Sequence, residues 1–123
     1  ISGDCKDYEM ELRKVRMAVD MGAESIMDLS NYGKTNTFRK QLIDMSPAMI
    51  GTVPMYDAIG YLEKDLLEIT AQDFLKVVEA HAKEGVDFMT IHAGINRRAV
   101  EAFMREGRKM NISPRGVAAV RRG

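Results

Sequence analysis

The sequence has one cysteine, no tryptophan and three prolines. It also lacks any apolar run approaching the roughly 20 residues that a membrane-spanning helix needs. With Cys5 as its single thiol, the chain can form no internal disulfide and no cysteine-cluster metal site of its own. The first residues are partly acidic, where a secretion signal would be basic and then apolar. These absences argue against a disulfide-stapled secreted domain and a membrane protein, and they predict a cytoplasmic chain.

The composition indicates one globular domain with a modest core. The chain has 123 residues, of which 46% are hydrophobic and 29% are charged. Its ten methionines are expected mainly to fill that core. The sequence opens on Ile1 rather than on methionine. We therefore expect it to be an internal segment of a longer protein.

The net charge is zero, but the charges are distributed unevenly along the chain. Residues 1–96 carry ten Lys/Arg and sixteen Asp/Glu, whereas residues 97–123 carry eight and two. A basic end can bind nucleic acid when aromatic side chains are interleaved with it, and here only Phe103 is present. We therefore expect a solvated basic face and no nucleic-acid partner.

Hydrophobic periodicity predicts helices that alternate with short buried strands. Helices are expected over 8–21, 35–44, 70–84 and 97–109, with a helical turn at 56–62. Strands are expected over 25–29, 48–53 and 86–92, with a fourth at 111–113. Gly22 and Gly85 occupy positions of left-handed helix caps, and Thr70 is a good N-cap with Asp73 in the first turn.

This order predicts an α/β fold of parallel βα units. It fits either an open doubly wound sheet or part of a (β/α)8 barrel of the TIM type. No dinucleotide-binding glycine fingerprint follows any strand, there is no P-loop, and the strands are too few for a usual doubly wound sheet. A complete barrel needs about 250 residues. The sequence therefore predicts a partial barrel over residues 1–110 and an atypical basic tail over 111–123.

Each predicted strand carries polar or soft side chains at its carboxyl end, where barrel enzymes place their active sites. They are Met27, Asp28 and Ser30 at the end of the first strand, Tyr56 and Asp57 just past the second, and His92 and Asn96 at the end of the third. Each has a simpler interpretation: His92 could be an interior histidine bonded to a carbonyl, and Tyr56 a core aromatic. His81 lies in mid-helix, where a packed role is expected.

Three segments, IMDLS, SPAMIGTVPMYDAI and EGVDFMTIHAGI, closely resemble the phosphomethylpyrimidine synthase (ThiC) family of thiamine biosynthesis. The likeness runs from about Met17 to about Asn96. It implies a (β/α)8 barrel and a radical S-adenosylmethionine enzyme that converts 5-aminoimidazole ribonucleotide into 4-amino-5-hydroxymethyl-2-methylpyrimidine phosphate. It also implies that Met27, Tyr56 and His92 contact that nucleotide.

The family uses a 4Fe–4S cluster, S-adenosylmethionine and zinc, and the resemblance implies that this chain holds none of their protein ligands. We therefore expect the chain alone to be inactive. The tail SPRGVAAVRRG departs from the serine–glycine pattern expected there, so Ser113 and Gly116 are poor candidates for phosphate contacts. A partial barrel leaves strand edges unpaired, which predicts a homo-oligomer.

Three functional interpretations remain open from the sequence. The first is a segment of the pyrimidine synthase. The second is a segment of its paralogue, the 5-hydroxybenzimidazole synthase of anaerobic cobamide biosynthesis, which starts from the same nucleotide. The third is a non-catalytic truncated barrel or binding module.

Overall fold

A computed structural model describes residues 1, 5–31, 35–62, 68–94 and 96–106. These fall into two units, one formed by Ile1–Asp65 with Ile69–Ile91 and one that includes the residues from His92 onward. Each unit is described by itself. The predicted strand at 111–113 and the tail at 111–123 lie outside the described residues.

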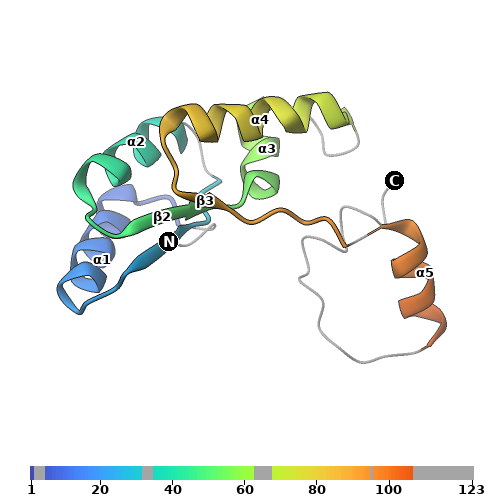
Figure 1. Cartoon of the computed structure of the whole chain (residues 1–123), viewed down its shortest axis with the longest axis horizontal. Helices are drawn as coiled ribbons and strands as arrows, with labels where there is room; N and C mark the ends of the chain where they lie inside the picture. The colour runs from blue at the N-terminus through green and yellow to red at the C-terminus, as the bar shows by residue number, and fades with distance from the viewer. Residues whose placement is uncertain (2–4, 32–34, 63–67, 95, 107–123) are drawn as a thin grey trace. The chain divides into compact units, whose positions relative to one another are not determined.

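The described residues of the first unit form a three-stranded parallel sheet and four helices (Figure 1). The elements in chain order are α1 (Tyr8–Asp20), β1 (Ser25–Asp28), α2 (Thr35–Met45), β2 (Met49–Thr52), α3 (Pro54–Leu62), α4 (Ala71–Glu84) and β3 (Phe88–Met89). The sheet order is β1-β2-β3, with Met27 opposite Gly51 and Gly51 opposite Phe88. The predicted α/β class with parallel strands is confirmed.

Three helix ends form where the sequence predicts them. Thr70 and Asp73 make a reciprocal capping box at the start of α4, in which the Thr70 hydroxyl accepts from the Asp73 backbone N–H at 3.1 Å. Gly22 and Gly85 have φ angles of 90° and 92° after α1 and α4, a conformation that glycine adopts without a steric penalty. These are local signals, which explains why sequence alone locates them.

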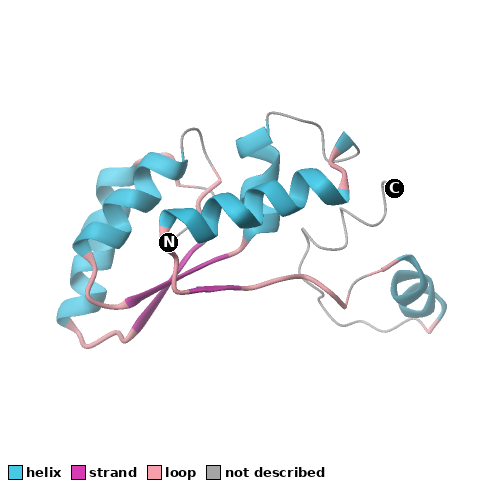
Figure 2. Ribbon diagram, turned by 45° about the horizontal axis from the view of Figure 1, so that its top comes forward, coloured by secondary structure: helices cyan, strands magenta, loops and turns pink. Residues whose placement is uncertain are grey.

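The helices cover one face of the sheet, as Figure 2 shows. Ile26 of β1 and Ile50 of β2 face this side and pack with buried apolar side chains of α1 and α2, namely Leu12, Val15, Phe38 and Leu42. The opposite face carries Met49, which is 52% exposed, and Phe88, which is 37% exposed. Side chains of a strand alternate between faces. Met27 therefore points to the opposite face from Ile26 and Asp28.

The predicted extent of the third strand and the predicted start of the helical turn after β2 were wrong. The third strand was expected over 86–92, but β3 pairs only at Phe88–Met89, and the helical turn expected at 56–62 is instead the helix α3 beginning at Pro54. Both corrections have one cause. Pro54 has no N–H and favours the first helical position, so β2 ends at Thr52. Thr90 donates to the Thr52 carbonyl at 2.8 Å, and no described residue of β2 lies beyond it to pair with a longer β3.

The second unit contains helix α5 (Arg97–Arg105), which begins where predicted but ends at Arg105, with Glu106 as its C-cap, rather than at 109. Asn96 is its N-cap, because the side-chain oxygen accepts from the Ala99 backbone N–H at 2.9 Å. This contact gives Asn96 a structural role. In the described part of the chain, no helix has the length and apolar character to span a membrane.

Candidate functional site

The three residues expected to bind the nucleotide lie in different settings. Met27 is half-buried in β1, and Tyr56 is half-buried in the first turn of α3, directly after β2. Both belong to the first unit. His92 belongs to the second unit, a few residues after β3 rather than at the end of a long strand. The structure thus positions Met27 and Tyr56 within one sheet–helix assembly and leaves His92 as a separate prediction.

A buried cluster of charges lies between the helices and the ends of the first two strands. Arg39 of α2 is 1% exposed. Its Nη2 atom donates to Asp57 Oδ2 at 3.2 Å, and its Nη1 atom lies 3.7 Å from Asp28 Oδ2. Its Nε atom donates to Glu84 at the end of α4. We call these four residues the Arg39 cluster.

Besides Arg39, Asp57 binds two side chains from other elements. His81 of α4 places its Nε2 atom 2.8 Å from Asp57 Oδ2, and Thr35 of α2 donates to Asp57 Oδ1 at 2.7 Å. The other ring nitrogen of His81 lies 2.9 Å from the Thr52 hydroxyl of β2. An ionised carboxylate only accepts hydrogen bonds, so His81 donates from Nε2. Asp57 thereby ties α3 to α2 and α4.

The electrostatics of Asp28 differ from those of Asp57. Burial raises the pKa of Asp28. Hydrogen bonding from Ser30, whose backbone N–H donates at 2.9 Å, and the charge of Arg39 offset this only in part. The nearby carboxylate of Asp57 also raises it. Asp28 is therefore held at some cost in its charged form.

Asp57 shows the opposite balance. Burial alone would raise its pKa, but the hydrogen bond from His81, the charge of Arg39 and the hydrogen bond from Thr35 outweigh burial and lower the pKa. Burial also disfavours the charge on Arg39, yet the bond to Glu84 and the neighbouring carboxylates raise its pKa. The Arg39–Asp57 contact is therefore a charged pair supported by hydrogen bonds from His81 and Thr35, whereas Asp28 Oδ2 is buried without a hydrogen-bond partner among the described residues.

The Asp57–His81–Thr52 chain has the order of groups found in nucleophilic triads, but Thr52 is 0% exposed. A nucleophile must reach its substrate, and this hydroxyl faces the helices rather than solvent. The described contacts instead hold backbone elements together. We therefore assign the chain of bonds to positioning and not to covalent catalysis.

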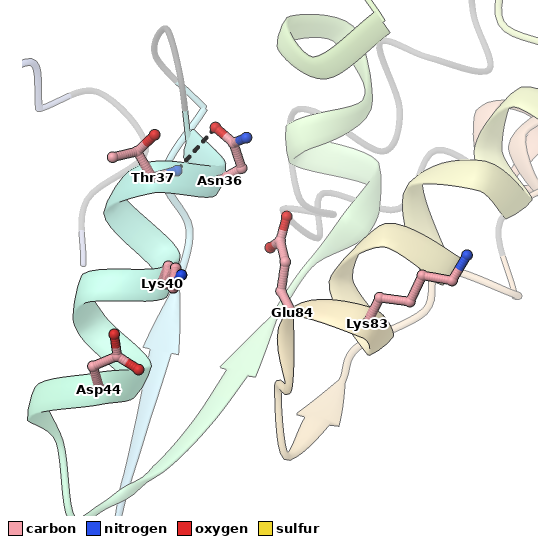
Figure 3. A pocket seen from close by; sticks show the side chains of 6 residues that line it. All are labelled: Asn36, Thr37, Lys40, Asp44, Lys83 and Glu84. Atoms are coloured by element: carbon pink, nitrogen blue, oxygen red, sulfur yellow. Dashed lines mark hydrogen bonds between the residues drawn. The ribbon is translucent and has the colours of Figure 1, made fainter.

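A cavity of about 430 Å³ lies between α2 and α4 (Figure 3). Its lining residues are Asn36, Thr37, Lys40, Asp44, Lys83 and Glu84. The lining combines two lysines with two carboxylates, so it presents no charge of one sign to a ligand. Met27 and Tyr56 do not line it. Glu84 belongs both to this cavity and to the Arg39 cluster, and it is the most exposed member of that cluster, with 20% of its side chain accessible.

The profile of the Radical SAM ThiC family matches residues 1–122. The chain belongs to this family.

The ThiC family match includes the Met17–Asn96 stretch and continues beyond it in both directions. The chain is 65% identical to the phosphomethylpyrimidine synthase of Clostridium tetani over 116 residues, which are 94% of this chain and 25% of that protein. It is 65% identical to the Clostridium novyi protein of the same name and 61% identical to that of Clostridium perfringens ATCC 13124, again over 94% of this chain and about a quarter of each relative. The chain thus spans about a quarter of the length of these relatives.

The description of the ThiC family as radical SAM implies a 4Fe–4S cluster and S-adenosylmethionine for the family. A cluster of this kind is held by several cysteine thiolates, and this sequence has only Cys5. Among the described residues, no three His, Cys, Asp or Glu side chains are grouped to hold a metal ion. The residues present here therefore do not fit the cluster.

Sequence reasoning singled out Asp28 and Asp57 as strand-end residues but missed what joins them. The missing member was Arg39. A signal for it exists, because Thr35, Phe38, Arg39 and Leu42 follow the spacing of one buried helix stripe. A charged residue on such a stripe requires buried partners. His81 was expected to be packed, and it is, at 1% exposure.

Proposed function

We propose that this segment supplies substrate contacts in a radical S-adenosylmethionine phosphomethylpyrimidine synthase acting on 5-aminoimidazole ribonucleotide. The reaction would be a carbon–carbon rearrangement of the lyase class that yields the phosphorylated pyrimidine of thiamine. The observation that carries this proposal is the family match over residues 1–122, together with relatives of up to 65% identity named phosphomethylpyrimidine synthase.

The proposed contacts are Met27, Tyr56 and His92. Tyr56 would donate from its phenol hydroxyl, Met27 would give a soft apolar contact, and His92 would hydrogen-bond to the ring or ribose. The fold supports two of them, since Met27 lies in β1 and Tyr56 comes shortly after β2 of the same parallel sheet. In a (β/α)8 barrel, which we propose for the complete protein, the carboxyl ends of strands carry the active site.

Several features of the whole protein belong to the same proposal. The cluster, S-adenosylmethionine and zinc would be held by residues outside this chain, so the chain alone would not turn over. The enzyme would act in the cytoplasm. We also propose a homo-oligomer, because β1 and β3 are edges of the described sheet. Sedimentation of the isolated chain as a monomer at micromolar concentration would contradict self-association.

The experiment replaces the corresponding segment of the Clostridium tetani relative with this chain and reconstitutes the chimera with its cofactors. Tyr56→Phe is compared with Tyr61→Phe, a tyrosine of the same helix that is 43% exposed. Loss of one substrate hydrogen bond predicts a loss in kcat/KM of about tenfold for the first variant and none for the second. Equal values for both variants would remove Tyr56 from the site.

The reaction product is the second measurement. Formation of the phosphorylated hydroxymethylpyrimidine supports the proposal, whereas 5-hydroxybenzimidazole would assign the chain to the cobamide branch. Met27→Ala is tested beside Met49→Ala, since both side chains face the open side of the sheet but Met49 lies at the amino end of β2. Only the Met27 variant should lower kcat/KM.

A further inference from the structure

The Arg39 cluster joins two residues whose chain neighbours are the proposed substrate contacts. Asp28 directly follows Met27, and Asp57 directly follows Tyr56. Both aspartates bind the same guanidinium, at 3.7 Å for Asp28 and 3.2 Å for Asp57. The side chain that joins them comes from a third element, α2.

We infer that Arg39 is a positioning residue that fixes Met27 and Tyr56 relative to each other. This inference rests on the proposed function, in which those two residues contact the nucleotide. Arg39 belongs to α2, on the helix-covered side of the sheet, and is 1% exposed. It would therefore act through Asp28 and Asp57 rather than by touching the substrate. Arg39 acts on the two proposed substrate contacts through its ion pairs with Asp28 and Asp57.

The link from each aspartate to its neighbour is geometric. Consecutive Cα atoms are about 3.8 Å apart, and consecutive side chains in a strand point to opposite faces. Holding Asp28 on the helix-covered face of the sheet therefore keeps Met27 on the opposite face, which also carries Met49 and Phe88. Asp57 is held by Arg39, His81 and Thr35, and this fixes the first turn of α3, which carries Tyr56.

The guanidinium group suits this task because of its shape. It is planar and can bind separate carboxylates from different nitrogens in fixed directions, whereas a lysine ammonium acts as a point charge. Arg39 uses Nη1 toward Asp28, Nη2 toward Asp57 and Nε toward Glu84. Arg39→Lys keeps the positive charge but loses the planar set of N–H donors that can reach several carboxylates at once. The variant therefore separates orientation from charge neutralisation.

Glu84 provides the matched control. It binds the same guanidinium, but the residues beside it, Lys83 and Gly85, are not proposed substrate contacts. Glu84→Gln therefore perturbs Arg39 through its Nε contact and leaves Asp28 and Asp57 intact. A purely structural role for Arg39 predicts similar effects from Arg39→Lys and Glu84→Gln.

The test uses the reconstituted chimera described above and 5-aminoimidazole ribonucleotide. Arg39→Lys should raise KM by about 10- to 100-fold with a smaller change in kcat, because misplaced contacts weaken binding. Glu84→Gln should change KM much less than Arg39→Lys, because it keeps Arg39 and its contacts to Asp28 and Asp57. Equal KM values for wild type and Arg39→Lys, while Tyr56→Phe still lowers kcat/KM, would overturn the inference and leave the proposed function standing. No effect of Tyr56→Phe would overturn both.

A second measurement covers the case in which Arg39→Lys yields no folded chimera. In the 123-residue chain, labelled methionine methyl and tyrosine ring resonances report Met27 and Tyr56 directly. The milder variant Asp28→Asn removes the ion pair between Asp28 and Arg39 and keeps Arg39 itself. We expect it to shift the Met27 methyl resonance, with Glu84→Gln leaving it in place. An unshifted Met27 resonance in folded Asp28→Asn would overturn the inference.

Discussion

His81 Nε2 lies 2.8 Å from Asp57 Oδ2, and each of these side chains is at most 2% exposed. The contact joins α4 to α3 across 24 positions of sequence. Arg39 binds the same carboxylate oxygen. One buried oxygen thus receives donors from two helices, and this explains why the pKa of Asp57 is lowered despite its burial.

The first prediction concerns Asp57→Asn. The change removes the charge that compensates buried Arg39, so we expect the free energy of unfolding at pH 7 to fall by about 3 kcal/mol or more. Urea unfolding of the chain measures it. Asp44→Asn is the control, since Asp44 lies exposed on α2 and should cost less than about 0.5 kcal/mol. Similar losses for both variants would refute the role of Asp57.

Asp28→Asn should behave differently. Burial raises the pKa of Asp28, so its charged form is held at a cost at pH 7. Asparagine keeps an oxygen for the Ser30 N–H and removes that cost, although it gives up the attraction to Arg39 at 3.7 Å. We expect a change in unfolding free energy within about 1 kcal/mol, of either sign. Urea unfolding that shows a loss as large as that of Asp57→Asn would contradict this balance.

The pH dependence of stability follows from the two opposite shifts. The lowered pKa of Asp57 stabilises the fold above the unfolded-state value of about 3.9, and this contribution is lost as the pH falls through the lowered value. The raised pKa of Asp28 favours folding at low pH, and that contribution is lost as the pH rises through the raised value. The stability difference between wild type and Asp57→Asn should therefore shrink below about pH 4. Urea unfolding at pH 7, 5 and 3 measures it, and a constant difference would contradict the assignment.

The elements that sequence predicted well are those with local signals. The Thr70–Asp73 cap and Gly85 delimit α4 within sixteen consecutive residues, and the spacing of apolar residues defines its buried side. No long-range information is needed for either. The extent of β3 depends instead on where β2 ends, and Pro54 sets that limit from more than thirty residues away.

The candidate site was predictable only in part for the same reason. Met27 and Asp28 end one strand, Tyr56 and Asp57 come shortly after the next, and strand position can be read from the sequence. Arg39 reaches Asp57 across 18 positions and Glu84 across 45, and no periodic pattern states which buried groups will meet. A buried arginine signals that partners exist without identifying them.

The final prediction concerns Gly51 and Phe88 on the open face of the sheet. A methyl group added at Gly51 would overlap the Phe88 ring, which lies over this glycine across the β2–β3 pair. We expect Gly51→Ala to lower the free energy of unfolding by about 1–3 kcal/mol, because the ring must leave its position. In a Phe88→Ala background the ring is absent, so the same substitution should cost much less. A double-mutant cycle by urea unfolding measures this coupling. Equal costs in the two backgrounds would mean that the Phe88 ring does not restrict the side chain at position 51.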